Sequence, residues 1–144
     1  MPACTFFGHR DCPNTIKPKL RQAIIDLIEN HNVDMFYVGN QGRFDAIVRG
    51  VLRELQQEYP QINHAVVLAY MPDEQTEYDD YSDPMLPEGI EFVHPRYAIS
   101  WRNNWMLKQA GYVVTYITHS LGGAAQSETK AKLMNLVVYN LANR

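Results

Sequence analysis

Three short glycine-bearing segments are the parts of this sequence best suited to chemistry. Residues 8–11 read Gly-His-Arg-Asp, residues 39–45 read Gly-Asn-Gln-Gly-Arg-Phe-Asp, and residues 118–125 read Thr-His-Ser-Leu-Gly-Gly-Ala-Ala. Each follows an apolar run typical of a strand and precedes a helical pattern. The amino end of a helix offers free N–H groups and a positive dipole end, and glycine lets an anion approach the backbone closely. These segments therefore favour anion binding, most simply of a phosphate.

The expected ligand contacts come from all three segments. They are Gly8, His9, Arg10, Gly39, Asn40, Gly42, Arg43, Phe44, Asp45, Gly122, Gly123 and Ala124. Taken singly, the glycine patterns are weak, because the sequence contains neither the G-x-G-x-x-G dinucleotide fingerprint nor a P-loop. A Gly-Gly pair is most often only a tight turn between a strand and a helix. The phosphate prediction therefore depends on the three segments meeting at one place.

Each charged candidate also has a purely structural interpretation. Arg10 would either clamp a phosphate or form an ion pair with Asp11 or Asp45. His9 would either donate to a phosphate or hydrogen-bond a neighbouring loop. Asp45 would either accept from a sugar hydroxyl or stabilise the free N–H groups of a helix start, and the sequence favours the helix start.

Other reactive residue types are sparse. Arg102 lies between Trp101 and Trp105, where it would either make cation–π contacts or reach the ligand. The histidines at 31, 64 and 94 have no metal-ligand spacing, so we expect no metal and no cofactor. Two cysteines, Cys4 and Cys12, make no disulfide framework and indicate reduced thiols in a cytoplasmic protein.

The elements that must position these segments alternate between strand and helix. Apolar runs predict five strands, at residues 3–7, 35–38, 65–70, 90–93 and 112–118. Helical spacing predicts helices at 17–31, from 44 to just before Pro60, at 97–110 and at 126–141. The expected fold is α/β, a three-layer, Rossmann-like, doubly wound domain with a mainly parallel five-stranded sheet. Ligands of such sheets bind beyond the carboxyl ends of the strands.

Length and charge fit a single domain covering residues 1–144. The chain is 46% hydrophobic and 20% charged, with a formal net charge of -3, which is ordinary for a globular protein. Neither a signal peptide nor an apolar run long enough for a membrane is visible. Residues 73–91 contain eight acids and no Lys or Arg. We expect an acidic loop at about 71–88, either simply solvated or closing over a basic ligand site.

The first two segments resemble a known superfamily. The run Cys4-Thr5-Phe6-Phe7-Gly8-His9-Arg10, followed by the pattern Gly39-x-x-Gly42-x-Phe44-Asp45, is similar to the YpsA-like branch of the SLOG superfamily. That superfamily groups Rossmann-like domains related to the DNA-processing protein DprA and to the LONELY GUY cytokinin-activating enzymes. The resemblance implies binding of nucleotides or NAD-derived molecules, in some members as sensors.

The C-terminal half resembles the LONELY GUY phosphoribohydrolases, whose pattern is Arg-Lys-x-x-Met, then a strand, then Pro-Gly-Gly-x-Gly-Thr-x-Glu-Glu. This chain keeps Arg102, Met106, the glycine pair and Glu128 at matching positions. It has Leu121, Ala125, Gln126 and Thr129 where that family has Pro, Gly, Thr and the second Glu. The resemblance therefore implies a phosphate site more strongly than it implies hydrolysis.

Three functions of different classes remain open. The first is binding of a phosphate-bearing nucleotide or an NAD- or ADP-ribose-derived ligand, as a sensor or carrier. The second is a phosphoribohydrolase that cleaves the N-glycosidic bond of a nucleoside 5′-monophosphate, for which the resemblance implies catalytic roles for Arg102 and Glu128. The third is a protein-interaction module that uses the acidic loop. Duplex nucleic acid is disfavoured because no long basic face appears.

Two further expectations concern the helices. Glu128 should lie in the first turn of the final helix, where it would bind ribose, act in catalysis or only stabilise the helix start. Trp101, Trp105 and Met106 give their helix more apolar bulk than one sheet face needs, which predicts a homodimer.

Overall fold

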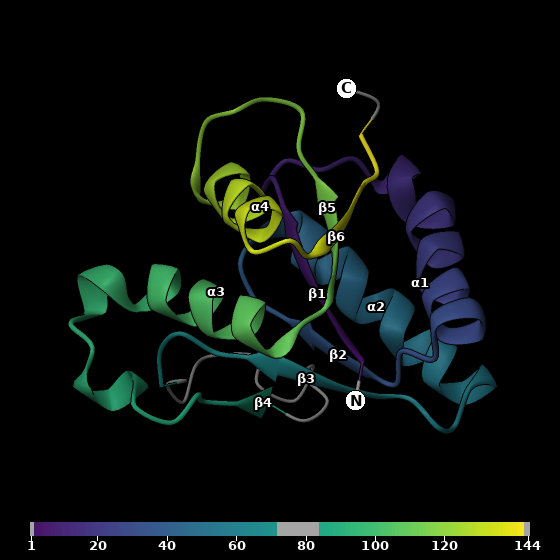
Figure 1. Cartoon of the computed structure of the whole chain (residues 1–144), viewed down its shortest axis with the longest axis horizontal. Helices are drawn as coiled ribbons and strands as arrows, with labels where there is room; N and C mark the ends of the chain where they lie inside the picture. The colour runs from purple at the N-terminus through teal and green to yellow at the C-terminus, as the bar shows by residue number, and fades with distance from the viewer. Residues whose placement is uncertain (1, 72–83, 143–144) are drawn as a thin grey trace.

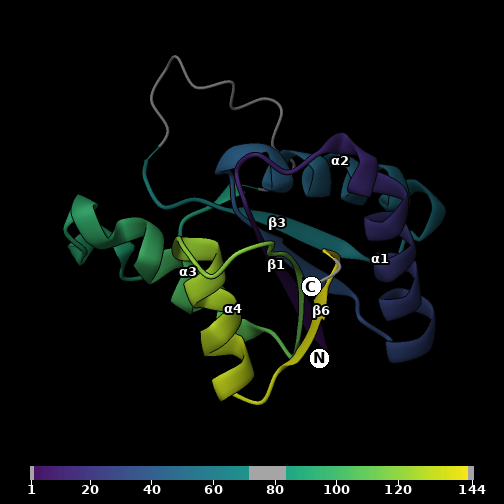
Figure 2. The ribbon, with the colours of Figure 1, turned by 90° about the horizontal axis from the view of Figure 1, so that it is seen from above.

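The chain folds into a parallel sheet of six strands with helices on both faces (Figures 1 and 2). The computed structural model describes residues 2–71 and 84–142. The strands are β1 (Ala3–Gly8), β2 (Met35–Val38), β3 (Asn63–Val67), β4 (Pro84–Met85), β5 (Tyr112–Tyr116) and β6 (Val137–Asn140). The α-helices are α1 (Lys17–His31), α2 (Gly42–Glu58), α3 (Ala98–Gln109) and α4 (Gly123–Leu133). Short 3-10 helices are η1 (Asn14–Ile16), η3 (Ile90–Phe92) and η4 (Pro95–Tyr97).

The order of the strands creates a reversal point at the middle of the sheet. The spatial order is β4-β3-β2-β1-β5-β6, and every neighbouring pair is parallel. The chain moves outward from β1 to β4 and then returns through α3 to place β5 on the other side of β1. Gly8 of β1 lies opposite Tyr116 of β5, so these two strands end side by side. A switch point of this kind is where open α/β sheets bind ligands.

Two hydrophobic cores, one on each face, hold the layers together. On the face covered by α1 and α2, Phe6 and Phe36 pack as stacked rings among fully buried helix residues such as Leu20 and Leu52. On the face covered by α3 and α4, Met106 packs with Phe7 and Val113. Figure 2 shows the two helix pairs on opposite sides of the strands. The sheet is therefore a rigid base for the loops at its carboxyl edge.

Six strands, rather than the predicted five, make up the sheet, and one predicted strand is wrong. Of residues 90–93, Ile90–Phe92 form η3, which follows a turn at Gly89 with φ of 96°, and only Ile90 of this helix is buried. Strand β4 lies inside the predicted loop, where Pro84 and Met85 pair with the end of β3. Strand β3 itself begins at Asn63 and ends at Val67, short of the predicted 65–70.

The predicted final helix, 126–141, is also wrong at both ends. Helix α4 begins at Gly123 and ends at Leu133, and Asn135 follows with φ of 62°, in the left-handed region. The chain then reverses into β6, whose β-branched start suits a strand. Leu133, Met134 and Val137 are exposed in this arrangement.

Other expectations fall partly outside what is described. Of the acidic loop at 71–88, residues 72–83 lie outside the described residues. Among the described helices, none combines the length and apolar composition that a membrane crossing requires.

The large side chains of α3 pack inward rather than outward. Met106 is buried, and the Trp105 ring meets Tyr37 edge-on, with ring centroids 5.4 Å apart. Trp101 packs against the small cluster formed by Ala69, Ile90 and Ala98. These side chains therefore no longer support the homodimer, which stays a prediction.

Candidate functional site

A cavity of about 460 Å³ lies at the carboxyl ends of β1 and β5, and we refer to it as the carboxyl-edge cavity. It is enclosed by the end of β1, the loop before α2, one side of α3 and the loop before α4. Its lining residues are Phe6, Phe7, Gly8, His9, Arg10, Asp11, Gln41, Asp45, Ile99, Arg102, Asn103, Met106, His119, Leu121, Gly122, Gly123 and Ala124. The cavity therefore sits at the switch point of the sheet.

Two glycines bring the first and second loops into contact. A Cβ on Gly8 would lie 2.2 Å from Cγ of the buried Phe44, so only glycine lets α2 approach β1 here. A Cβ on Gly42 would lie 2.9 Å from Cα of Arg10, and Gly42 has φ of 85°. The Arg43 N–H donates to the Arg10 carbonyl (3.1 Å). The start of α2 thus fixes the backbone at Arg10.

The Arg10 side chain is exposed and lines the cavity. Among the described residues it forms no ion pair, with Asp11, Asp45 or any other carboxylate. Of the two interpretations of Arg10, the ion pair is therefore not formed in this structure. With respect to the described residues, its guanidinium is available to an anion in the cavity.

His9 holds the third loop against the first. Its Nε2 accepts a hydrogen bond from the Thr118 N–H (3.0 Å), and its ring stacks on His119 with centroids 3.9 Å apart. His119 Nδ1 in turn accepts from the Leu121 N–H (3.3 Å). Each ring nitrogen that accepts an N–H carries no proton. His9 thus takes the loop-bonding role, and both imidazoles help to set the shape of the loop before α4.

Arg102 and Asp45 form the charged wall of the cavity. Arg102 is 2% exposed, and it donates from Nη1 to the Val67 carbonyl (2.9 Å) and from Nε to Asn103 Oδ1 (2.8 Å). Nη1 also reaches Asn40 Oδ1 at 3.4 Å. The Asp45 carboxylate accepts from the Gln41 N–H (3.0 Å). This arrangement fixes a cation and a carboxylate in place before any ligand arrives.

Burial dominates the electrostatics of this pair. It raises the pKa of Asp45 to about 6, although the Gln41 N–H and the charges of Arg102, Arg49 and Arg10 act to lower that pKa. Burial also lowers the pKa of Arg102, and the nearby Asp45 acts to raise it. An arginine remains protonated through the physiological range. Asp45 therefore changes charge near neutral pH beside a permanent cation.

The N-terminus of α4 opens onto the cavity. Gly122, with φ of 96°, precedes the helix, and no described side chain caps it. The first helical hydrogen bond is donated by Gln126 to the Gly122 carbonyl (3.1 Å), which leaves the earlier N–H groups outside the helix ladder. A Cβ on Gly122 or Gly123 would meet no atom within 4 Å. N–H donors thus face a part of the cavity that no described side chain fills.

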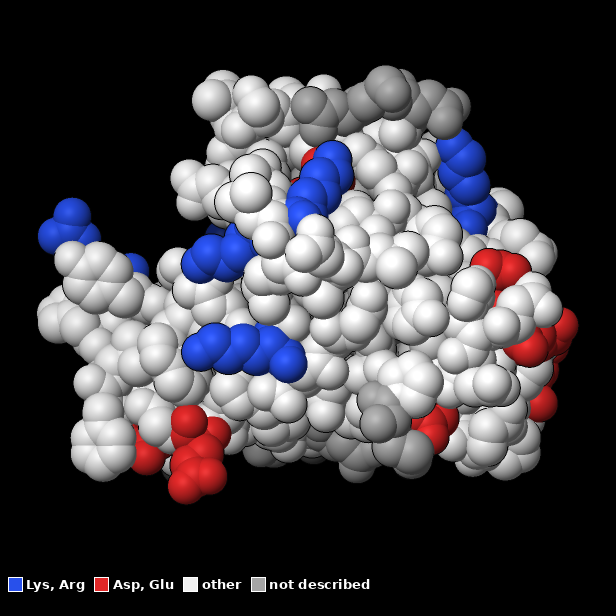
Figure 3. All heavy atoms as spheres, in the orientation of Figure 1, with Lys and Arg blue, Asp and Glu red and all other residues white. Residues whose placement is uncertain are grey.

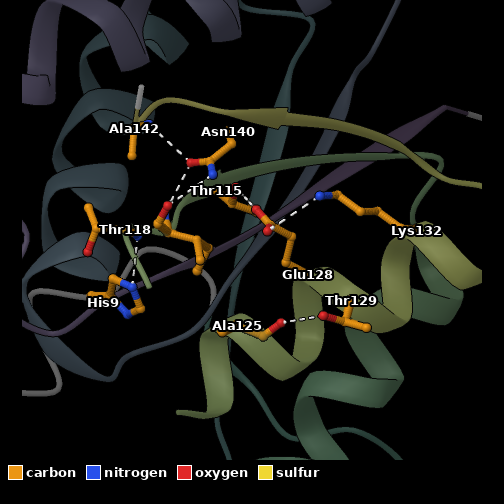
Figure 4. A network of polar contacts seen from close by, with 10 residues as sticks. His9, Thr115, Thr118, Ala125, Glu128, Thr129, Lys132, Asn140 and Ala142 are labelled. Atoms are coloured by element: carbon orange, nitrogen blue, oxygen red, sulfur yellow. Dashed lines mark hydrogen bonds and ion pairs between the residues drawn. The ribbon is translucent and has the colours of Figure 1, made fainter. Parts of the chain in front are cut away.

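Side chains from the sheet hold the loop before α4 in place (Figure 4). The Asn140 amide pairs with both backbone groups of Ile117, donating to its carbonyl (3.0 Å) and accepting from its N–H (3.1 Å). The same Asn140 oxygen accepts from the Ala142 N–H (3.0 Å). Asn140 therefore continues the pairing of β5 and β6 past the end of β5.

Glu128 ties α4 to the sheet and lies away from Arg102. It is the sixth residue of α4, in the second turn rather than the predicted first. Thr115 Oγ1 donates to its Oε2 (2.6 Å), and Lys132 Nζ lies 3.7 Å from its Oε1 (Figure 4). Glu128 lines a different cavity, together with Thr129, and not the carboxyl-edge cavity. The two residues for which the resemblance implies catalysis are thus not brought together.

The structure separates the remaining predicted residues into two groups. Those that line the cavity are Gly8, His9, Arg10, Asp45, Gly122, Gly123, Ala124 and Arg102. Those that do not line it are Gly39, Asn40, Gly42, Arg43 and Phe44. Gln41, Asn103 and His119 also line the cavity and were not predicted. Gln41 and His119 lie inside two of the glycine-bearing segments, and Asn103 directly follows Arg102. Their position next to predicted residues was the only indication of them in the sequence.

Comparison with solved structures shows a similar fold in another protein. The X-ray structure of DNA processing protein A (DprA) from Streptococcus pneumoniae matches with a TM-score of 0.68 and 16% sequence identity, over 96% of this chain and 49% of that chain. This chain thus spans about half the length of that structure. No model of a protein family matches the sequence, and no curated protein does. At this identity the likeness shows the fold alone, an α/β fold of the Rossmann-like kind.

Proposed function

We propose that this chain binds a phosphate-bearing nucleotide, or a ligand derived from NAD or ADP-ribose, in the carboxyl-edge cavity. The observation that carries the proposal is the uncapped N-terminus of α4, which faces the carboxyl-edge cavity beside Gly122 and Gly123. Two arginines, Arg10 and Arg102, line the same cavity. A helix N-terminus with cations around it is a ready anion site.

The placement of Asp45 and Arg102 in the same cavity wall supports recognition of a sugar next to the phosphate. A buried carboxylate held by one backbone N–H keeps further acceptor capacity for hydroxyl groups. Arg102 is held by three described acceptors, so its position is fixed. The proposed ligand therefore places its phosphate at α4 and its ribose near Asp45.

The motif around Gly8 also supports a place for this chain in the YpsA-like branch of the SLOG superfamily. Two buried free thiols, Cys4 and Cys12, support a cytoplasmic location, which is part of the same proposal.

A calorimetric titration with AMP, NAD and ADP-ribose tests the proposal. Wild type should bind at least one of them, and Arg10→Ala should lower that affinity by about tenfold, because a charged hydrogen bond to phosphate is lost. Arg10 is exposed, so this variant should fold normally. The matched control is Lys108→Ala, in the last turn of α3, which should bind like wild type. An affinity of Arg10→Ala equal to that of wild type would contradict the proposed site.

Hydrolysis of a nucleoside 5′-monophosphate is a second candidate, and Asp45 is the observation that favours it. N-glycosidic cleavage needs a carboxylate near the developing positive charge on the sugar. Asp45 supplies one on the cavity wall beside Arg102, whereas Glu128 lines another cavity. Release of ribose 5-phosphate by wild type and its loss in Asp45→Asn would support this candidate. Product from Asp45→Asn at the wild-type rate would exclude Asp45 from the reaction.

A further inference from the structure

A second cavity, of about 350 Å³, adjoins the carboxyl-edge cavity between α3 and α4, and we refer to it as the α3–α4 cavity. The two cavities share Ile99, Asn103 and Gly123 in their linings. Gly123 is the first residue of α4. The N-terminus of α4 therefore stands between the two cavities rather than at the end of one.

The α3–α4 cavity is lined by cations and neutral polar groups. Arg96, from η4, and Lys130, from α4, lie in its wall together with Ser100, Asn104, Gln126 and Ser127, and none of its described lining residues is Asp or Glu. Figure 3 shows Lys and Arg side chains over the α3 and α4 side of this face, while Asp and Glu gather mainly at its lower and right margins.

Neither cation is neutralised within the described part of the chain. Lys130 Nζ donates to the neutral Asn104 Oδ1 (2.8 Å), and the Arg96 guanidinium lies 5.8 Å from the centroid of the Tyr97 ring. No described carboxylate forms an ion pair with either residue. Two uncompensated cations beside hydroxyl and amide groups are suited to an anion.

We propose that the α3–α4 cavity binds the second phosphate of a diphosphate-bearing nucleotide, whose two phosphates lie across the N-terminus of α4. This inference rests on the proposed function, because it requires the first phosphate to occupy the carboxyl-edge cavity. There the first phosphate meets Arg10, and the second phosphate meets Arg96 and Lys130. A mononucleotide leaves the α3–α4 cavity empty, so the two cavities together select for the diphosphate.

The pair AMP and ADP isolates this contact, because the two ligands differ by one phosphate. Both are titrated calorimetrically into wild type, into the double variant Arg96→Ala/Lys130→Ala, and into the control Lys108→Ala. Wild type and the control should bind ADP about tenfold more tightly than AMP. The double variant should lose that preference while it keeps the wild-type affinity for AMP within about twofold. Both substituted residues are exposed, and thermal melting checks that the variants fold.

The outcomes separate this inference from the proposed function. If wild type binds AMP and ADP equally, or if the double variant weakens both ligands by the same factor, the second subsite is wrong and the first remains. If neither ligand binds wild type at millimolar concentration, the inference falls with the proposed nucleotide site. Raising the salt concentration should weaken ADP more than AMP in wild type, because ADP makes more charged contacts.

Discussion

Arg102 Nη1 and Asp45 Oδ2 converge on Gly39 from opposite faces of the sheet. A Cβ at Gly39 would lie 2.9 Å from the first atom and 2.8 Å from the second. Arg102 comes from α3 and Asp45 from α2, yet the two side chains form no direct ion pair in the described structure. A buried charge without a close partner is costly, and such sites are often functional.

The first prediction concerns the proton on Asp45. Burial raises the pKa of Asp45 from 3.8 to about 6, so between these values the folded protein holds the proton more tightly than the unfolded chain. The stability that this proton contributes is present below about pH 4 and is lost as the pH rises through 6. Between pH 4 and pH 7, wild type should therefore lose up to about 3 kcal/mol of unfolding free energy relative to Asp45→Asn.

Urea denaturation of both proteins at the two pH values measures this difference. Comparison with the variant cancels the titration of every group that the substitution leaves unchanged. A difference that is constant with pH, or that grows in favour of wild type as the pH rises, would contradict a raised pKa for Asp45.

The second prediction contrasts two glycines. Gly8→Ala should destabilise the fold by about 1–3 kcal/mol, because its Cβ would overlap the buried Phe44 ring. Gly50→Ala is the matched control, since Gly50 lies within α2 and a Cβ there meets no atom within 4 Å. It should stabilise the protein by about 0.5–1 kcal/mol. Chemical denaturation measures the free energy of unfolding of both variants. Equal changes for the two substitutions would show that a Cβ at Gly8 does not overlap the Phe44 ring.

The third prediction assigns Glu128 to stability rather than to the ligand. Glu128→Ala removes the acceptor of the buried Thr115 hydroxyl, which should cost about 1–3 kcal/mol of unfolding free energy. Lys132→Ala removes only an ion pair with a largely exposed lysine and should cost less than about 1 kcal/mol. Neither substitution should change the affinity for AMP or ADP-ribose. If Glu128→Gln lost affinity for AMP or ADP-ribose while its stability stayed unchanged, Glu128 would belong to the ligand site.

The sequence predicted the architecture better than the ends of its elements. The spacing of apolar residues gave α1 its observed bounds, Lys17–His31, because the helix is amphipathic and ends at a left-handed Asn32. The residues after Leu133 were misassigned because Val137 and Val138 continue a helical spacing, and only the left-handed Asn135 reveals the turn. A single sequence does not show that conformation.

The candidate site was predictable in outline only. Strand ends marked Gly8 and Gly122 as neighbours, because parallel strands finish at the same edge. The side of α4 that bears Glu128 depends on where the helix begins. The predicted start at Gln126 and the observed start at Gly123 differ by almost one turn, and pairing with Thr115 depends on tertiary packing. Likewise, the Phe44 ring packs against Gly8, which has no side chain. The spacing of residues in the sequence does not reveal this contact.

The measurement that tests the central claim most directly is a calorimetric titration of AMP and ADP-ribose into wild type and Gly123→Ala. A methyl group at Gly123 meets no atom of the protein within 4 Å, so the variant should fold as wild type does while the methyl enters the space proposed for the phosphate. The account predicts binding by wild type and a loss of about tenfold or more in Gly123→Ala. Wild-type affinity in the variant, or no binding of either ligand by wild type at millimolar concentration, would contradict a phosphate site at the start of α4.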